Sequence, residues 1–191
     1  QAAGKKPGEA IVATKWWPMF RFASNIGKTI NERIKFLEPY PIDLYQVHQS
    51  FGFSGEKAEM TAMADLFNRK LIKSIGVSNF SARKMENSWK VLREFGIPLA
   101  SNQVRYSLLD RRIESNGVMD LAKKLGITVI AYSPLAQGLV SGKFHDNPDL
   151  IKNIGIRKYT PLFKKEGLEK SRPVIILLKE LASKYNVTPS Q

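Results

Sequence analysis

The sequence contains no cysteine. Without thiols the chain cannot form disulfides, and no cysteine thiolate can act as a nucleophile or bind a metal. We predict no metal site. We expect a cytoplasmic protein, because a chain without disulfides is compatible with the reducing cytoplasm.

Long apolar runs are also missing. No run approaches the ~20 residues that a transmembrane helix needs, and no charged-then-apolar leader opens the sequence. We therefore expect neither secretion nor membrane insertion.

Acidic residues are scarce, with 17 Asp and Glu against 30 Lys and Arg, which gives a net charge of +13. Such an excess can attract polyanions or phosphorylated ligands. The basic residues are spread along the expected helices and do not form one arm. Solvated helix faces account for them better than a nucleic-acid surface, so we predict no nucleic-acid partner.

The sequence has neither G-x-G-x-x-G nor G-x-x-x-x-G-K-[ST], the glycine-rich turns that bind phosphates in open parallel sheets. It does have five apolar runs that each end in polar or aromatic side chains. The residues that follow the runs are Lys15, His48, Ser78-Asn79, Asn102-Gln103 and Tyr132-Ser133. Helical patterns separate these runs, which predicts parallel strands with helical crossovers.

Functional residues at the ends of many successive strands favour a closed (β/α) barrel over an open doubly wound sheet. A complete barrel has eight strands in about 250 residues, and this sequence represents about five of the eight. We predict an α/β fold, a partial (β/α)8 TIM-type barrel forming a single domain over residues 1–191. The Thr188-Pro189-Ser190-Gln191 sequence resembles the start of another helix, so both ends look cut from a larger protein.

The helical segments carry their own signals. Ser24 and Ser81 are predicted N-caps, and the last helix is expected to bury Val174, Leu177, Leu178 and Leu181. Between the fifth strand and this helix, residues 136–169 are rich in glycine and proline and are expected to form a long loop. Loops of this length in compact domains are typically lids or binding loops.

A family resemblance rests on five motifs in register. They are Ala13-Thr14-Lys15, Asp43-Leu44-Tyr45-Gln46-Val47-His48, Gly76-Val77-Ser78-Asn79-Phe80, Asn102-Gln103-Val104 and Ala131-Tyr132-Ser133-Pro134-Leu135. In order and spacing they resemble the aldo-keto reductases, over nearly the whole chain. The resemblance implies a (β/α) barrel that binds NADP(H), less often NAD(H), and reduces aldehydes and ketones to alcohols.

The resemblance implies catalytic roles for two residues. Lys15 matches the lysine that lowers the pKa of a tyrosine proton donor, and His48 matches the histidine that orients the carbonyl. The same residue types also occur as a solvated lysine or a hydrogen-bonded histidine at a strand end. Trp16, Trp17 and Phe20 either line the substrate pocket or simply pack.

Cofactor contacts carry over in the same way. Ser78, Asn79 and Gln103 match residues that hydrogen-bond the nicotinamide amide, although Ser78-Asn79 also suits an ordinary capped turn. Tyr132 matches the residue that stacks on the nicotinamide ring, and residues 136–169 are expected to cover the cofactor. The residues expected beside the pyrophosphate are Ser133, Pro134, Leu135, Gln137, Gly138 and Lys143.

The departures from the family pattern leave alternatives open. The family's aspartate and proton-donor tyrosine lie upstream of the strand that ends at Lys15, and nothing in this chain matches them, so an inactive fragment is one reading. Voltage-gated potassium channel β-subunits, which are cofactor-bound regulatory partners, resemble the chain closely from Ser133 to Lys143. They lack a histidine where His48 stands, which favours the enzyme.

Overall fold

The structure is a computed structural model, and it describes residues 6–191. Its contacts group into two compact units. Within the described residues, the first comprises residues 6–104 and Arg112–Ala131, and the second comprises Arg105–Arg111 and Tyr132–Gln191. The single domain over residues 1–191 stays a prediction.

The sheet confirms the predicted α/β architecture. Its five strands are neighbours in the order in which they occur in the sequence, β1-β2-β3-β4-β5. They are β1 (Ala13–Trp16), β2 (Leu44–Val47), β3 (Ile75–Ser78), β4 (Leu99–Arg105) and β5 (Thr128–Tyr132). The first four pair in parallel. Sequential parallel strands joined by helices are the arrangement of a (β/α) barrel, here with five of its strands.

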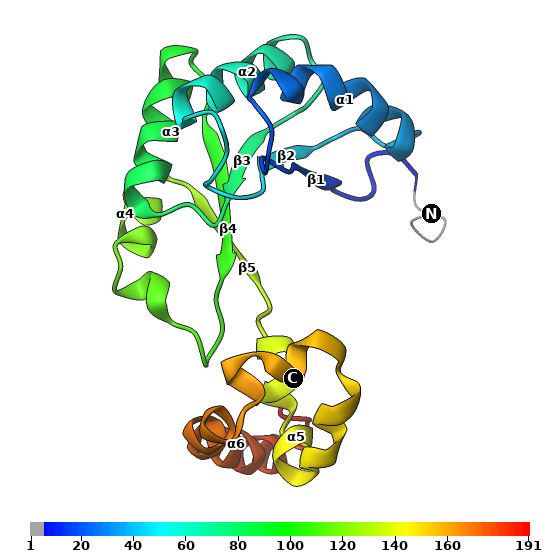
Figure 1. Ribbon diagram of the computed structural model, residues 1–191, viewed down its shortest axis with the longest axis vertical. Helices are drawn as coiled ribbons and strands as arrows, with labels where there is room; N and C mark the ends of the chain where they lie inside the picture. The colour runs from blue at the N-terminus through cyan, green and yellow to red at the C-terminus, as the bar shows by residue number, and fades with distance from the viewer. Residues whose placement is uncertain (1–5) are drawn as a thin grey trace. The chain divides into compact units, whose positions relative to one another are not determined.

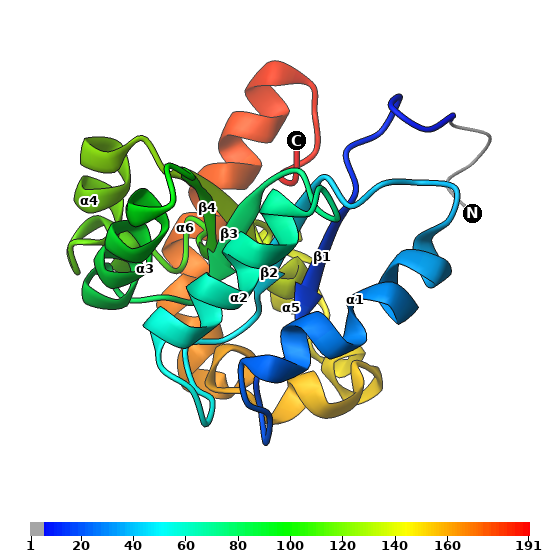
Figure 2. The ribbon, with the colours of Figure 1, turned by 90° about the horizontal axis from the view of Figure 1, so that it is seen from above.

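Four helices of the first unit lie along one face of the sheet (Figure 1, Figure 2). They are α1 (Ser24–Leu37), α2 (Glu56–Asn68), α3 (Ala82–Glu94) and α4 (Val118–Leu125), with a short 3-10 helix, η1 (Arg112–Glu114), before α4. Each presents apolar residues at helical spacing to the interior, such as Ile26 and Ile30 of α1 and Met85 and Leu92 of α3.

One predicted N-cap is confirmed and the other is wrong. The Ser81 hydroxyl accepts a hydrogen bond from the backbone N–H of Lys84 at 3.4 Å, as an N-cap should. Ser24 is instead the first residue of α1, and the cap position falls on Ala23, which already has helical dihedrals. The Ala23 N–H is satisfied from elsewhere, because it donates to the Ser54 hydroxyl at 2.9 Å.

The two faces of the sheet have different surroundings. On the helix side, the Trp16 indole N–H donates to Asn25 of α1 at 3.0 Å, and the Asn102 amide donates to the Phe80 carbonyl at 3.0 Å. On the opposite face, Gln46 pairs with Gly76 and Gly76 with Ser101, and the Gln46 amide donates to the Ser101 hydroxyl at 3.4 Å.

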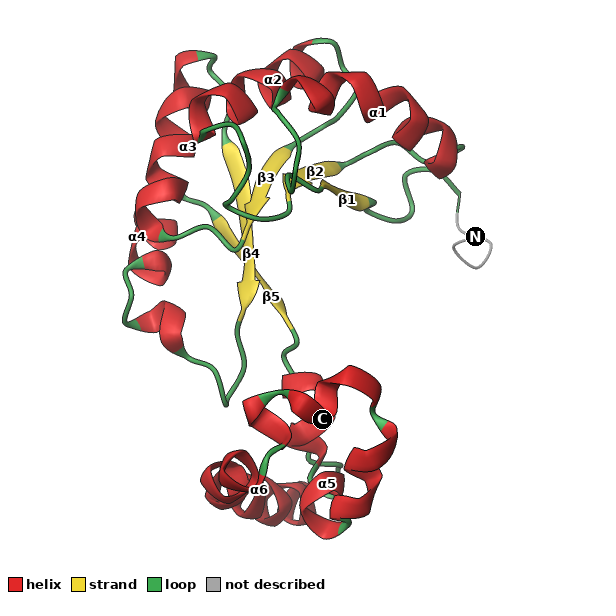
Figure 3. Cartoon of the chain, viewed as in Figure 1, coloured by secondary structure: helices red, strands yellow, loops and turns green. Residues whose placement is uncertain are grey.

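The second unit consists mainly of helices (Figure 3). Residues 136–169, predicted as a loop, are organised into short helical segments, and the last helix begins inside the same stretch. The segments are η2 (Ala136–Ser141), α5 (Lys143–Asp146), η3 (Pro148–Asn153), η4 (Gly155–Tyr159), η5 (Pro161–Phe163) and α6 (Lys165–Tyr185). They enclose a small apolar core that includes Leu139, Phe144 and Phe163.

The predicted buried face of the last helix is partly wrong. Leu177 and Leu181 are 54% and 41% exposed. The residues of α6 that are buried are Ser171, Ile175 and Ala182, whose spacing of four and seven residues defines a face rotated from the predicted one. Within the described residues, no helix is both long and apolar enough to cross a membrane.

We expect Gly76→Ala to destabilise the protein by about 1–3 kcal/mol, the usual cost of overpacking a core. A Cβ at position 76 lies 2.5 Å from the Ser101 hydroxyl oxygen and 3.1 Å from Gln46 Cγ, so these side chains or the strand backbone must shift to make room. Urea unfolding measures the effect. Gly27→Ala is the control, since nothing lies within 4 Å of its new methyl group in α1. It should stabilise the helix by about 0.5–1 kcal/mol. Equal effects at both positions would contradict the packing argument.

Candidate functional site

The register of the sheet brings the predicted residues of the first unit to one edge. Paired residues of parallel neighbours lie on the same face, and Lys15 pairs with Gln46 while Ser78 pairs with Gln103. Side chains two positions apart on a strand also share a face. His48 follows Gln46 by two residues, so it shares the face of Lys15, Ser78 and Gln103 at the C-terminal edge.

His48 is held through its backbone and its ring. Its N–H donates to the Trp16 carbonyl at 3.0 Å, and its carbonyl accepts from the Asn79 amide at 3.3 Å. The imidazole meets the Trp17 ring edge to face, with 4.8 Å between the ring centroids. Burial lowers the pKa of His48, and the positive charge of Lys15 lowers it further. The imidazole is therefore uncharged at neutral pH and can donate a hydrogen bond without carrying a charge.

Lys15 lies at the same edge of the sheet. It is half-buried in β1 and close enough for its charge to act on His48. A cation and an uncharged imidazole side by side can stabilise negative charge that develops on a ligand oxygen.

Ser78, Asn79 and Gln103 form a compact polar group. The Ser78 hydroxyl and the backbone N–H of Asn79 both donate to the backbone carbonyl of Gln103, each at 2.9 Å. Asn79 has a φ of 60°, a left-handed conformation that asparagine tolerates better than most residues. Its amide donates to Ser78 Oγ at 3.2 Å. These mutual hydrogen bonds hold hydroxyl and amide groups together at adjacent strand ends.

The three aromatic candidates differ in their surroundings. Trp17 and Phe20 are 36% and 80% exposed, and Trp17 touches the His48 ring. Trp16 is fully buried on the helix side of the sheet, where its indole binds Asn25. Because alternate side chains of a strand point to opposite faces, Trp16 cannot share a pocket with Trp17. Of the two readings open for Trp16, packing is the one that its full burial supports.

The remaining candidates belong to the second unit. The Arg105 guanidinium lies over the Tyr132 ring, 5.8 Å from its centroid. The chain then turns sharply, because Ser133, Ala136, Gln137 and Gly138 all have positive φ. Alternation of right- and left-handed residues, as at Leu135 and Ala136, directs successive N–H groups to one side and can bind an anion. Lys143 is exposed and begins α5, and Pro134 and Leu135 are exposed within the turn.

Sequence reasoning missed the residues that support this edge. Gln46 is 1% exposed and donates to the Val77 carbonyl at 3.2 Å as well as to Ser101. In the sequence, Gln46 is a polar amide within an otherwise apolar strand, and this pattern could have indicated its supporting role. Lys84 contacts the Ser50 carbonyl and lies 3.3 Å from Glu56, yet in the sequence it is an ordinary helix lysine. No local pattern identifies its role.

Glu59 is a buried acid beneath the loop that follows His48. It is 3% exposed, and its carboxylate oxygen lies 3.2 Å from the Cβ position of Gly52 in that loop. Burial raises the pKa of Glu59 to about 7, the charge of Glu56 adds to the rise, and the Lys84 cation opposes it. The described residues contain no group of three or more histidines and acids that could hold a metal ion.

Known proteins are similar to this chain in both sequence and fold. A family model described as the aldo/keto reductase family matches residues 1–191. An uncharacterized oxidoreductase of Mycobacterium tuberculosis is 32% identical over 193 residues, covering 100% of this chain and 57% of the relative. An aldo-keto reductase of Schizosaccharomyces pombe, named with NADP(+), is 29% identical over 87% of this chain and 48% of its own length.

The structure is similar to a glycerol dehydrogenase from Gluconobacter oxydans, with a TM-score of 0.82 and 28% sequence identity. That match covers 96% of this chain and 58% of the other. The chain thus spans about half the length of the curated relatives that it matches.

We expect Glu59→Gln to flatten the dependence of stability on pH. The folded state holds the Glu59 proton with a pKa of about 7, above the ordinary value of 4.5. Between these values the folded state binds more protons than the unfolded state, so this group costs stability as pH rises. The loss is complete above pH 7 and amounts to roughly 3 kcal/mol or less. Urea unfolding from pH 4.5 to 8 measures the effect.

Glu86→Gln is the control for this prediction. Glu86 is an exposed acid of α3 that pairs with Lys90 at 3.0 Å. Its loss should change stability little at any pH. If Glu59→Gln and Glu86→Gln give the same pH profile, Glu59 is not a buried acid of raised pKa.

Proposed function

Because the chain belongs to the aldo/keto reductase family, we propose that its protein is an oxidoreductase that reduces aldehyde or ketone carbonyls to alcohols. The observation that carries the proposal is the placement of His48 and Lys15 on one face at the C-terminal edge of the sheet, where burial and then the Lys15 charge lower the pKa of His48. Functional residues in barrels of this kind lie at that edge.

The proposed chemistry follows from the charge that develops on the substrate. Reduction at the carbonyl carbon leaves negative charge on the oxygen, which hydrogen-bond donors and cations stabilise. His48 donates its ring N–H to that oxygen and fixes its orientation. The positive charge of Lys15 stabilises the developing oxyanion and, by the family resemblance, the phenolate of a tyrosine proton donor that no residue of this chain matches. Trp17 and Phe20 form the apolar part of the substrate pocket for a small-molecule carbonyl compound.

The proposed cofactor is NADP(H), with NAD(H) less favoured, and when bound it supplies the hydride. Ser78, Asn79 and Gln103 are proposed for the nicotinamide amide because their hydroxyl and amide groups lie on adjacent strand ends, where hydrogen bonds hold Ser78 and Asn79 in place. In the second unit, Tyr132 is proposed to stack on the nicotinamide ring. The residues proposed for the pyrophosphate are Ser133, Pro134, Leu135, Gln137, Gly138 and Lys143.

The chemistry of the second unit fits this assignment. The positive-φ turn at Ala136 offers backbone N–H groups, and Lys143 adds a positive charge. Residues 136–169 are proposed to cover the cofactor. The cytoplasmic location and the absence of a nucleic-acid partner stay predictions.

We expect Lys143→Ala to weaken NADPH binding about three- to tenfold, because one cation near a phosphate contributes roughly 1 kcal/mol at a solvated site. Fluorescence titration measures the dissociation constant, with NADH as the comparison cofactor. Lys152→Ala is the control, since Lys152 is 79% exposed and pairs with Asp149. Equal affinities for both variants would remove Lys143 from the proposed pyrophosphate site.

We expect His48→Phe to lower kcat for carbonyl reduction about 100-fold, as loss of a hydrogen-bond donor to an oxyanion does. Phenylalanine keeps a ring against Trp17 but offers no N–H. The rate of carbonyl-dependent NADPH oxidation measures the loss, and the NADPH dissociation constant should stay within about twofold because the altered group binds the substrate. A variant as fast as the parent protein would exclude His48 from the reaction.

A further inference from the structure

We propose that Lys84 is a positioning residue for His48, acting through the loop that joins β2 to α2. The role in catalysis rests on the proposed carbonyl reduction. The role in holding the loop rests on contacts that are independent of it.

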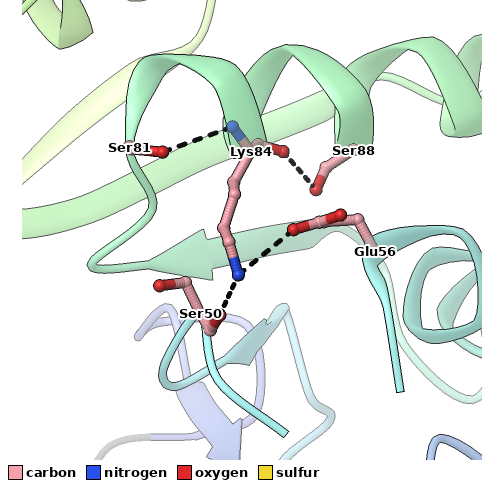
Figure 4. A network of polar contacts seen from close by, with 5 residues as sticks. All are labelled: Ser50, Glu56, Ser81, Lys84 and Ser88. Carbon is pink, nitrogen blue, oxygen red and sulfur yellow. Dashed lines mark hydrogen bonds and ion pairs between the residues drawn. The ribbon is translucent and has the colours of Figure 1, made fainter. Parts of the chain in front are cut away.

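Lys84 ties the two ends of this loop together. Its ammonium donates to the backbone carbonyl of Ser50, near the start of the loop, and lies 3.3 Å from the carboxylate of Glu56, the first residue of α2. Figure 4 shows the side chain reaching down from α3 toward both groups. A lysine ammonium has three donor hydrogens, so one cation can serve a carbonyl and a carboxylate at once.

The position of Lys84 is itself well defined. The N-cap Ser81 accepts a hydrogen bond from its N–H at 3.4 Å, and its carbonyl accepts from the Ser88 hydroxyl at 2.9 Å. The helix therefore begins at a fixed point after β3, and Lys84 is the third residue of α3. This makes the start of α3 a rigid anchor for the neighbouring loop.

A second tie comes from the same connection between β3 and α3. The Asn79 amide donates to the His48 carbonyl at 3.3 Å. The short segment from His48 to Ser50 is thus held at its first residue by Asn79 and at its last by Lys84. Two anchors on one rigid connection restrict where the His48 backbone can lie.

The loop also reaches the His48 ring through its aromatic residues. Phe51 follows the anchored Ser50 directly and packs edge to face on Trp17, with 6.1 Å between centroids. Trp17 in turn meets the His48 imidazole at 4.8 Å. Release of Ser50 would free Phe51, and the contact that orients the imidazole would loosen with it.

Burial separates Lys84 from an ordinary surface lysine. The side chains of Lys84 and Glu56 are 32% and 21% exposed. On the same helix, Lys90 and Glu86 form a pair with 59% and 43% exposure, one turn apart. Exposed pairs of that kind contribute little, and the Lys90 pair holds no loop. Lys90 is therefore the matched control.

The experiment compares Lys84→Met, Lys84→Arg and Lys90→Met with the parent protein. The chain has only two histidines, so the His48 ring signals can be assigned by NMR. In the parent protein, the neighbouring Trp17 ring should move the NMR chemical shifts of the His48 ring protons away from their values in the unfolded chain. We expect Lys84→Met to move these shifts toward the unfolded values, whereas Lys84→Arg and Lys90→Met keep them.

Kinetics provides the second readout. Lys84→Met should lower kcat/KM for carbonyl reduction about tenfold and leave the NADPH dissociation constant within about twofold. Lys84→Arg keeps the charge and donors, so it should recover most of the rate. A general folding defect in Lys84→Met would instead disturb the His145 signals, which lie in the second unit, and the cofactor affinity as well.

Each outcome decides one point. An unchanged His48 shift in Lys84→Met, or an equal change in Lys90→Met, overturns the proposal. A changed shift with an unchanged kcat/KM in an active enzyme overturns the catalytic part and leaves a purely structural tie. If the parent protein has no reductase activity but Lys84→Met still changes the His48 chemical shift, the proposed function has failed while Lys84 still positions His48.

Discussion

The register between parallel neighbours, which includes one shift between Ile75 and Gly76 on β3, is the constraint on which the candidate site depends. It aligns Lys15 with Gln46, Gly76 with Ser101 and Ser78 with Gln103 on one face. A shift of one residue in any strand would turn its polar side chain toward the helices. The opposite face is fixed by its own contacts, such as that of Trp16 with Asn25, so the two faces enforce the same register.

Directly beneath the C-terminal edge, a tightly packed polar layer supports that register. Gln46 spans from its own strand to the Val77 carbonyl and the Ser101 hydroxyl, and Gly76 leaves no room for a side chain between them. A buried amide with satisfied partners specifies one arrangement, because any other leaves it unpaired. Gln46 and Gly76 precede His48 and Ser78 by two residues on the same face of the sheet. The packing of this layer therefore restricts the backbone that carries the candidate site.

The loops above the edge are held by electrostatics as well as by packing. Lys84 joins Ser50 to Glu56, Asn79 holds the His48 carbonyl, and Glu59 lies buried below Gly52. The same Lys84 cation that contacts the loop at Ser50 also opposes the rise in the pKa of Glu59 beneath it. A site of this design keeps its aromatic contacts while the loop itself remains largely at the surface.

The sequence by itself determined the five strands and their helical connections, since the spacing of apolar residues is a local signal. The candidate residues follow the strands as expected, and their roles stay predictions. It could not settle on which face Trp16 lies, because both members of the Trp16-Trp17 pair are apolar and only the sheet register separates them. The helices within residues 136–169 escaped prediction because they are short and pack mainly on one another. Only the tertiary structure decided the roles of Lys84 and Glu59, because both depend on partners brought together by the parallel strands and on burial, which no local pattern records.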